Sequence, residues 1–263
     1  MHLIARAKLG TVSKALGLLD ILAQSGTRHG LTEIARLSGN DKATTRRLLV
    51  ELKVNGFVEQ PDGGRDYVLG SALLTLGRAR EDQFPFFKIV QPIIRALAEA
   101  TGETSHASEY SAGVMNSVCS QQSDKSNRVI VRSGEKLPLH ATASGLAFLA
   151  SCSVDEIDTF LRKSLPSYTE ATLTQSAQIM PLIAEARSCG YSMSNQLREE
   201  GVHSVAAAIL NPHRRPIGAV AVAMPSVRAT PEKLALTGEM AIGAAKDISV
   251  RLFGQTAASR KTP

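Results

Sequence analysis

The sequence predicts an α+β protein in which an N-terminal winged helix-turn-helix is joined by a linker helix to a larger domain built on one antiparallel sheet. Three observations predict this architecture. Residues 31–54 carry two short helical patterns separated by a glycine, strand patterns flank a turn within residues 57–69, and strand pairs are mixed with helices beyond Thr101. A chain of 263 residues that is 43% hydrophobic is long enough for two domains, so we expect two separate cores.

The first expected element is an amphipathic helix from Val12 to Ala23. Its apolar positions share one face, which would complete the core of the N-terminal domain: Ala15, Leu18, Leu19 and Leu22. The residues before this helix contain neither a continuous apolar stretch nor a small-residue cleavage site, so we expect no signal peptide.

The next segment predicts two helices joined by a tight turn. The first has Thr32 at its expected N-cap and Gly39 at its end, and its apolar face is formed by Leu31, Ile34, Ala35 and Leu37. The second begins at Asn40-Asp41 and directs inward Thr45, Leu48, Leu49 and Leu52. This arrangement is typical of a helix-turn-helix, whose second helix enters the major groove of DNA.

A wing is expected from two strand patterns, Phe57–Gln60 and Asp66–Leu69, around the turn Pro61-Asp62-Gly63-Gly64. The expected DNA contacts come from the first helix, the leading edge of the second helix and the wing: Thr32, Lys42, Thr44, Arg46, Arg47 and Arg65. The alternative is that these side chains form only a solvated face. The joint occurrence of a cap, a turn, a basic edge and a wing favours DNA binding.

The charge distribution supports a nucleic-acid partner. Residues 1–80 contain twelve Lys and Arg against seven Asp and Glu, whereas residues 81–263 contain eighteen against seventeen. The basic excess is therefore N-terminal, where a phosphate-binding module requires it. We expect double-stranded DNA as the partner of this domain, with an affinity that falls steeply as salt increases.

A connector is expected between the two domains. Ser71–Arg80 leads away from the wing, Pro85 interrupts any helix that continues from it, and a new helix runs from Lys88 to Thr101. These limits give a DNA-binding domain at residues 8–72, linker helices at 73–100 and a second domain at 101–256. The apolar cluster of Phe84, Phe86 and Phe87 disfavours a monomer.

The second domain shows strand patterns at Glu103–Ser111, Gly113–Gln121, Asn127–Arg132, Val202–Leu210 and Ile217–Met224. Helical patterns cover Asp155–Lys163, Ile179–Ser188 and Pro231–Leu252, the last with Thr230 as its cap. Pro181 is expected in the first turn of its helix or at a kink. Strands that pair while helices segregate predict one central antiparallel sheet, and the polar tail Ala257–Pro263 is expected to fray.

Several classes of protein are disfavoured. No run of about 18 apolar residues is present, so we expect no transmembrane helix and no membrane partner. Cys119, Cys152 and Cys189 are odd in number and far apart, which fits thiols in a reducing cytoplasm and not a disulfide framework or zinc site. Catalytic and cofactor motifs are missing from fitting contexts, so we expect no enzyme, no metal and no cofactor.

The loop LPLHATASG runs directly into an apolar helix and predicts an anion site. Backbone N–H groups of residues 142–145 would lie at the helix N-terminus, where a carboxylate binds favourably. On the strand at 103–111, either the Ser105 side or the His106 side faces a pocket. Pocket lining and plain sheet surface are both open as interpretations of these polar side chains. His140 either donates to a ligand or is a packed, hydrogen-bonded histidine, and the second alternative is favoured.

Four motifs resemble the isocitrate lyase regulator (IclR) family of bacterial transcription factors: LTEIARLSGNDKATTRRLL, LPLHATASG, Gly190-Tyr191 and EGVHSVAAAILNPHRRPIGAVAVAM. The resemblance covers residues 12–253. It implies a winged helix-turn-helix, a linker helix and a GAF-like C-terminal domain that binds a small effector, assembled into dimers and often tetramers. In the reading helix Lys42, Thr44 and Arg47 keep the family residues, whereas Asp41 and Ala43 replace a proline and a serine.

The resemblance also implies which positions contact the effector. They are the backbone of the loop before the apolar helix and side chains of the later strands: Ala143, Ser144, Ser194, Ser204, Ala221 and Ala223. This set is less polar than in members that sense very small polar acids, which implies a larger or more apolar carboxylate, such as an aromatic acid. We therefore expect an effector-responsive transcription regulator. The alternative is a winged-helix protein whose C-terminal domain only oligomerises.

Overall fold

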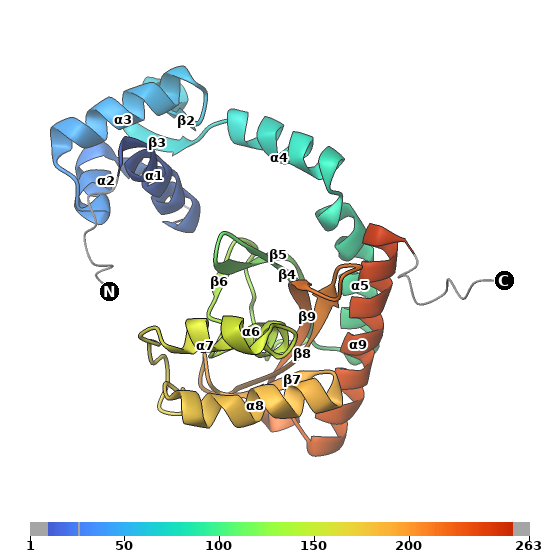
Figure 1. Ribbon diagram of the computed structural model, residues 1–263. Coiled ribbons are helices and arrows are strands. Elements are labelled where there is room, and N and C mark those ends of the chain that lie inside the picture. Colours follow the sequence, from blue (N-terminus) through green and yellow to red (C-terminus); the bar gives the residue numbers. More distant parts are fainter. Residues whose placement is uncertain (1–9, 26, 255–263) are drawn as a thin grey trace. The chain divides into compact units, whose positions relative to one another are not determined.

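The computed structural model describes residues 10–25 and 27–254 of the chain (Figure 1). These residues form two compact units that divide between Phe84 and Pro85. The polar tail expected from Ala257 to Pro263 lies outside the described residues, as do residues 1–9.

The N-terminal unit combines helices with a small sheet. Its elements within residues 10–25 and 27–84 are α1 (Thr11–Ser25), β1 (His29–Gly30), α2 (Leu31–Ser38), α3 (Lys42–Val54), β2 (Val58–Glu59), the 3-10 turn η1 (Pro61–Gly63), β3 (Asp66–Leu69) and α4 (Ala72–Gln83). The strands pair antiparallel in the order β1-β3-β2. The core comprises Leu18, Leu19, Leu22, Ile34, Leu48, Leu49, Val58 and Tyr67. The predicted helix-turn-helix and wing are thus confirmed.

The start of α2 differs from the prediction. Its N-cap is Gly30, at the end of β1, and Thr32 lies exposed in the first helical turn. The sequence pattern missed β1, whose pairing of Gly30 with Asp66 fixes where the helix begins. Leu37 was expected to face the core, but it is 45% exposed. Gly39 ends α2 in the left-handed conformation, with φ of 66°, as expected for a C-terminal glycine.

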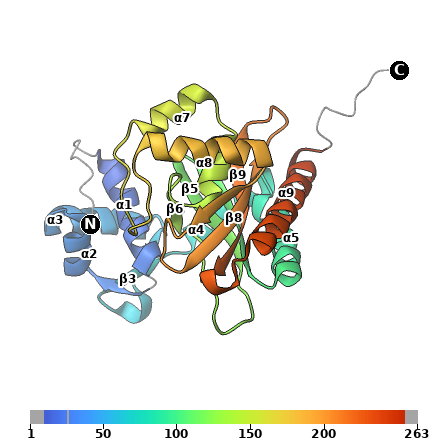
Figure 2. The same ribbon diagram turned by 90° about the horizontal axis from the view of Figure 1, so that it is seen from below.

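The C-terminal unit is a mixed sheet-and-helix structure. Its elements within residues 85–254 are α5 (Phe86–Thr101), β4 (Thr104–Ser111), β5 (Val114–Gln121), β6 (Lys136–Leu137), α6 (Ala143–Ala150), α7 (Val154–Leu161), α8 (Ser176–Cys189), β7 (Ser192–Asn195), β8 (Val202–Leu210), β9 (Pro216–Pro225), the 3-10 turn η2 (Ser226–Arg228) and α9 (Pro231–Phe253). The strands form one antiparallel sheet in the order β6-β5-β4-β9-β8-β7. Helices α5 and α9 pack together against one face, and α6 and α8 lie at the other (Figures 1 and 2).

The strand register decides which side chains share a face of this sheet. One row of cross-strand partners runs through β7, β8, β9 and β4: Ser194, Ser204, Ala223 and Thr104. Two positions further along β4, His106 pairs with Ala221 of β9, and Ala221 packs against Ala143 and Ala147 of α6. Both rows therefore face α6, because side chains two residues apart on a strand point the same way. Ser105 pairs with Val222 and faces α5 and α9 instead.

The strand expected at Asn127–Arg132 is absent from the described sheet. The carbonyl of Val129 accepts a hydrogen bond from the hydroxyl of Thr104 at 2.6 Å, and the carbonyl of Val131 accepts one from Ser120 at 2.9 Å. Side chains thus hold this segment in place of a strand ladder. The alternation that suggested a strand reflects the burial of Val129 and Val131.

Other elements also correct the prediction. Helix α8 begins at Ser176, earlier than expected, so Pro181 lies in the second helical turn and not in the first. Strand β7, which forms one edge of the sheet, was not expected. Phe86 is fully buried in the core of the C-terminal unit and is unavailable for association, whereas Phe87 is 38% exposed.

Candidate functional site

Helix α3 begins with a side-chain cap that replaces the proline of the family pattern. The carboxylate of Asp41 accepts a hydrogen bond from the Thr44 backbone N–H at 2.8 Å, and this bond lowers the pKa of Asp41. The Thr45 hydroxyl turns inward and donates to the Asp41 carbonyl at 2.9 Å. The aspartate therefore has a structural role at the start of the helix.

The solvent-facing side of α3 is basic. Lys42, Arg46 and Arg47 are exposed opposite the buried face formed by Thr45, Leu48 and Leu49. Val50 is 48% exposed and follows Arg46 and Arg47 at helical spacing. It was not expected on this face, because an uncharged side chain does not mark a DNA contact in the sequence. A face of this kind can contact phosphates and guanine edges through its cations, and a thymine methyl through the valine.

The remaining predicted DNA contacts lie on other parts of the same unit. Thr44 is partly buried in the first turn of α3, and Thr32 is exposed in the first turn of α2. Arg65 is exposed between η1 and β3, which places it at the tip of the wing.

The C-terminal unit contains a cavity of about 70 Å³ on the α6 face of its sheet. Strand residues, the N-terminus of α6 and the segments at 129–137 and 194–202 surround it. Six predicted effector contacts line this cavity: His106, Ala143, Ser144, Ser194, Ser204 and Ala223. Two do not, because Ser105 faces the opposite helices and Ala221 is covered by Ala143 and Ala147.

Helix α6 directs its N-terminus at the cavity. The hydroxyl of Thr142 accepts the Gly145 N–H at 3.1 Å and so caps the helix. The N–H groups of Ala143 and Ser144 precede the first intrahelical hydrogen bond, and both residues line the cavity. Gly145 permits this approach, since a Cβ there would lie 2.2 Å from the Cα of Leu139. The helix N-terminus expected in this loop is therefore present, and its first residues line the cavity.

His106 adds a neutral polar group to the cavity. Its Nε2 lies 3.3 Å from the Ser144 hydroxyl, and its buried Nδ1 has no hydrogen-bond partner among the described residues. Burial lowers the pKa of His106 to about 4, so the imidazole is uncharged at neutral pH. A neutral imidazole carries one N–H, which can donate to a ligand oxygen.

His140 does not line the cavity. Its Nε2 lies 2.9 Å from the Pro166 carbonyl, which supports the packed, hydrogen-bonded alternative. Three charged residues of the lining were not expected from the sequence: Glu135, Arg198 and Glu199. These residues lie in loops, where no periodic pattern marks a side chain that turns inward.

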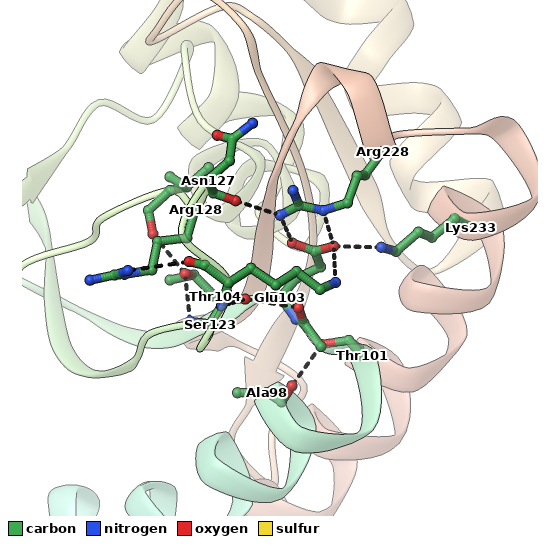
Figure 3. Close-up of polar contacts among 12 residues, drawn as sticks. Ala98, Thr101, Glu103, Thr104, Ser123, Asn127, Arg128, Arg228 and Lys233 are labelled. Atoms are coloured by element: carbon green, nitrogen blue, oxygen red, sulfur yellow. Dashed lines mark hydrogen bonds and ion pairs between the residues drawn. The ribbon is translucent and has the colours of Figure 1, made fainter.

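A buried carboxylate lies close to the cavity wall. Glu103 has no solvent exposure and contacts Lys125, Arg228 and Lys233, as Figure 3 shows for the last two. Arg228 forms a bidentate pair with it, at 2.7 and 2.6 Å, and also donates to the Asn127 carbonyl at 2.9 Å. The cluster therefore joins the start of β4 to the segment before Val129, to η2 and to the first turn of α9.

The electrostatic balance at Glu103 favours the ionised form. Burial by itself would raise the pKa of this carboxyl group, but hydrogen bonds from Arg228, Lys233 and Lys125 outweigh it and hold the pKa at about 2. The carboxylate is thus charged across the physiological pH range, with three cations around it.

Two further properties bear on the class of protein. The described residues contain no group of three or more His, Cys, Asp or Glu side chains arranged to hold a metal ion. No described helix combines the length and the apolar character needed to cross a membrane.

Comparison with known proteins gives matches along almost the whole chain. The IclR helix-turn-helix domain matches residues 11–62, and the bacterial transcriptional regulator IclR C-terminal domain matches residues 81–250. The transcriptional repressor IclR of Escherichia coli strain K12 is 32% identical over 256 residues, which are 95% of this chain and 92% of that protein.

Solved structures agree with these matches. The crystal structure of an ICLR transcriptional regulator from Silicibacter sp. TM1040 has a TM-score of 0.83 at 38% identity and covers 93% of this chain and 97% of its own. An IclR homologue from Microbacterium hydrocarbonoxydans, crystallised with 4-hydroxybenzoate, has a TM-score of 0.79 at 20% identity, with 92% and 99% covered, and shares the fold. The chain therefore belongs to the IclR family of DNA-binding transcriptional regulators, which are not enzymes, and its C-terminal domain is the effector-binding domain of that family.

Proposed function

We propose that this regulator controls transcription in the cytoplasm by binding an operator through α3 and the wing, and that a small organic acid in the C-terminal cavity alters this binding. The observation that carries the proposal is the cavity at the N-terminus of α6, where the N–H groups of Ala143 and Ser144 and the imidazole of His106 converge. All three can donate hydrogen bonds to a carboxylate, and none brings a negative charge.

The size of the cavity favours a short acid. Its volume of about 70 Å³ is below the roughly 150 Å³ of an apolar cavity that accepts benzene. A carboxylate of two to four carbons suits this space better than the aromatic acid that the apolar lining suggested. Ser194 and Ser204 offer hydroxyls to a second polar group of the ligand, and Ala223 leaves room beside them.

On the DNA side, Lys42, Arg46, Arg47 and Arg65 supply the cations, and Thr32 and Thr44 supply hydroxyls for phosphate oxygens. The DNA-binding domain corresponds to residues 8–72, the linker helices to 73–100 and the effector domain to 101–256. A homodimer or homotetramer fits four of the exposed apolar side chains of the N-terminal unit, those on α1 and α4: Val12, Leu16, Leu74 and Leu76. Sedimentation velocity at several concentrations tests this assembly.

The effector proposal is tested by a thermal-shift screen of the full chain against two- to four-carbon carboxylates, benzoate and the matched amides. A ligand that binds only the folded state raises Tm by mass action. We expect short carboxylates to raise Tm and amides to have little effect, and Ser204→Leu, which fills the cavity, to abolish the shift. A panel without any stabilising acid would instead favour a C-terminal domain that only oligomerises.

The DNA proposal is tested with a duplex selected by this protein from a random library. Arg47→Ala should weaken binding and reduce the slope of log affinity against log salt by about 1, because one phosphate contact is lost. Arg162→Ala removes the same charge from an exposed position after α7 and is the matched control. If the two variants bind the duplex alike, the placement of the reading face is wrong.

A further inference from the structure

An ion pair lies at the mouth of the effector cavity. Arg198 Nη2 is 3.3 Å from Glu135 Oε1, and the two side chains are 33% and 34% exposed. Arg198 comes from the loop between β7 and β8, and Glu135 from the segment before β6. Two loops far apart in the sequence therefore meet at this point.

Both loops are held in place by hydrogen bonds to their backbones. The hydroxyls of Thr169 and Thr172 donate to the carbonyls of the two residues before Arg198, each at 2.7 Å. On the other side, the Ser117 N–H donates to the Glu135 carbonyl at 2.9 Å, which ties this segment to β5. Both loop backbones are therefore anchored beside the two charged side chains.

The pair lies where an inner space adjoins an outer one. Arg198 and Glu135 both line the cavity of about 70 Å³, and Glu135 also lines an outer recess of about 590 Å³. The two spaces share further lining residues: Val129, Ile130, Glu199 and Val202. The outer recess contains the cations Arg128 and Arg132, which can receive the Glu135 carboxylate if it leaves Arg198.

Arg198 is well suited to receive a carboxylate. Among the described residues that line the inner cavity, it is the one Lys or Arg. Its guanidinium lies 4.7 Å from the ring centroid of Tyr168, which holds the plane of the group. The contact with Glu135 is longer than the roughly 2.7–2.9 Å of a strong charge-assisted bond, and it uses one of five N–H donors.

We propose that Arg198 captures the carboxylate of the effector by exchanging Glu135 for it, so that Glu135 is a built-in competitor that sets both affinity and selectivity for acids. This inference rests on the proposed function, since it presumes that the cavity takes an organic acid. In the empty state the ion pair closes the mouth and neutralises Arg198. In the bound state the ligand carboxylate lies between the guanidinium and the N-terminus of α6, and Glu135 turns to the outer recess.

The test measures binding of a short carboxylate and its amide to the full chain by calorimetry, in wild type, Arg198→Gln and Glu135→Gln. Arg198→Gln should weaken acid binding by about tenfold or more, because a hydrogen-bonded charge pair is lost, and leave the much weaker binding of the amide unchanged. Glu135→Gln should strengthen acid binding several-fold, because the competitor is removed. Arg162→Gln, which removes one exposed charge elsewhere in the same unit, should bind like wild type.

The outcomes separate this inference from the proposed function. If wild type binds the acid and both variants bind it equally well, the Arg198 exchange is overturned while the acid-binding cavity stands. If neither wild type nor Glu135→Gln binds any acid, both proposals are overturned. Arg198→Lys provides a second variant should Arg198→Gln fold poorly: it keeps the charge, loses the planar fork, and should bind acid with intermediate affinity.

Discussion

The most demanding test of the C-terminal unit is the substitution Glu103→Gln. Gln has nearly the same shape as Glu but no charge, so the change leaves Lys125, Arg228 and Lys233 clustered around a neutral amide. Removal of one partner from a buried ion cluster is destabilising because the remaining charges lose their counter-charge. We expect the C-terminal unit to unfold more easily, with no effect on the fold of the N-terminal unit.

The magnitude follows from the pKa of Glu103. A value of about 2 in place of the ordinary 4.5 corresponds to about 3 kcal/mol in favour of the folded state at neutral pH, at about 1.36 kcal/mol per unit. The three cations are 46%, 23% and 28% exposed, so solvent screens part of this attraction. The expected loss is therefore about 2 kcal/mol, or roughly 4–8 °C in Tm for a unit of this size.

The assay is urea unfolding followed by far-UV circular dichroism, with Glu99→Gln, an exposed position on α5, as the control. Because the folded-state pKa of Glu103 lies below the unfolded one, its contribution is complete above about pH 4.5 and is lost as the pH falls toward about 2. The gap between wild type and Glu103→Gln should be constant from pH 7 to pH 5 and shrink below that. Equal losses in both variants, or a gap at pH 3 as large as the gap at pH 7, would refute this reasoning.

Three further predictions concern the cavity. Gly145→Ala should unfold the C-terminal unit, since the added Cβ would lie 2.2 Å from Leu139 Cα. The control Gly243→Ala adds a Cβ with no atom within 4 Å and should raise Tm slightly. Equal Tm values for the two variants would contradict the close packing of Gly145 against Leu139. Burial lowers the pKa of His106 from 6.5 to about 4. Its contribution to the free energy of unfolding, up to about 3 kcal/mol, is therefore complete above pH 6.5 and is lost as the pH falls toward 4. His106→Gln should remove this pH dependence of the free energy of unfolding, measured by urea unfolding at several pH values. If the free energy changes with pH as it does in wild type, another group causes the dependence. Thr142→Ala should lower the free energy of unfolding by about 1 kcal/mol, while Thr142→Ser should retain the cap and the stability.

The helix-turn-helix was predictable because its signals are local. The inward positions Thr45, Leu48 and Leu49, the turn glycine Gly39 and the capping Asp41 all act within a few residues of the chain. The exact start of α2 was not predictable in the same way. Gly30 is the residue that caps α2 because it pairs with Asp66 of β3, 36 residues later, and that contact leaves no trace in the local sequence.

The residues of the cavity also divide into those that local sequence predicts and those that depend on distant contacts. Ala143 and Ser144 follow from a loop that runs into a helix, so the anion site could be expected from the sequence. The choice between Ser105 and His106 required the register of β4 against β9, because alternation gives two faces without naming the inner one. Arg198 and Glu135 could not be expected, since each is a loop charge whose partner lies 63 residues away.

The pairing of β4 with β9 also bears on how the protein is made. Ser108 lies opposite Ala219, 111 residues further along, so the central pair of the sheet forms only after nearly the whole chain has left the ribosome. The core of the N-terminal unit comes from residues 18–67 and can assemble much earlier, as domains do during synthesis. During synthesis the DNA-binding domain would therefore fold before the effector-binding domain is complete. A chain that ends before β9 would leave one edge of β4 unpaired, and an unpaired strand edge favours aggregation. Such a truncated chain should therefore aggregate and not accumulate as a DNA-binding protein without effector control.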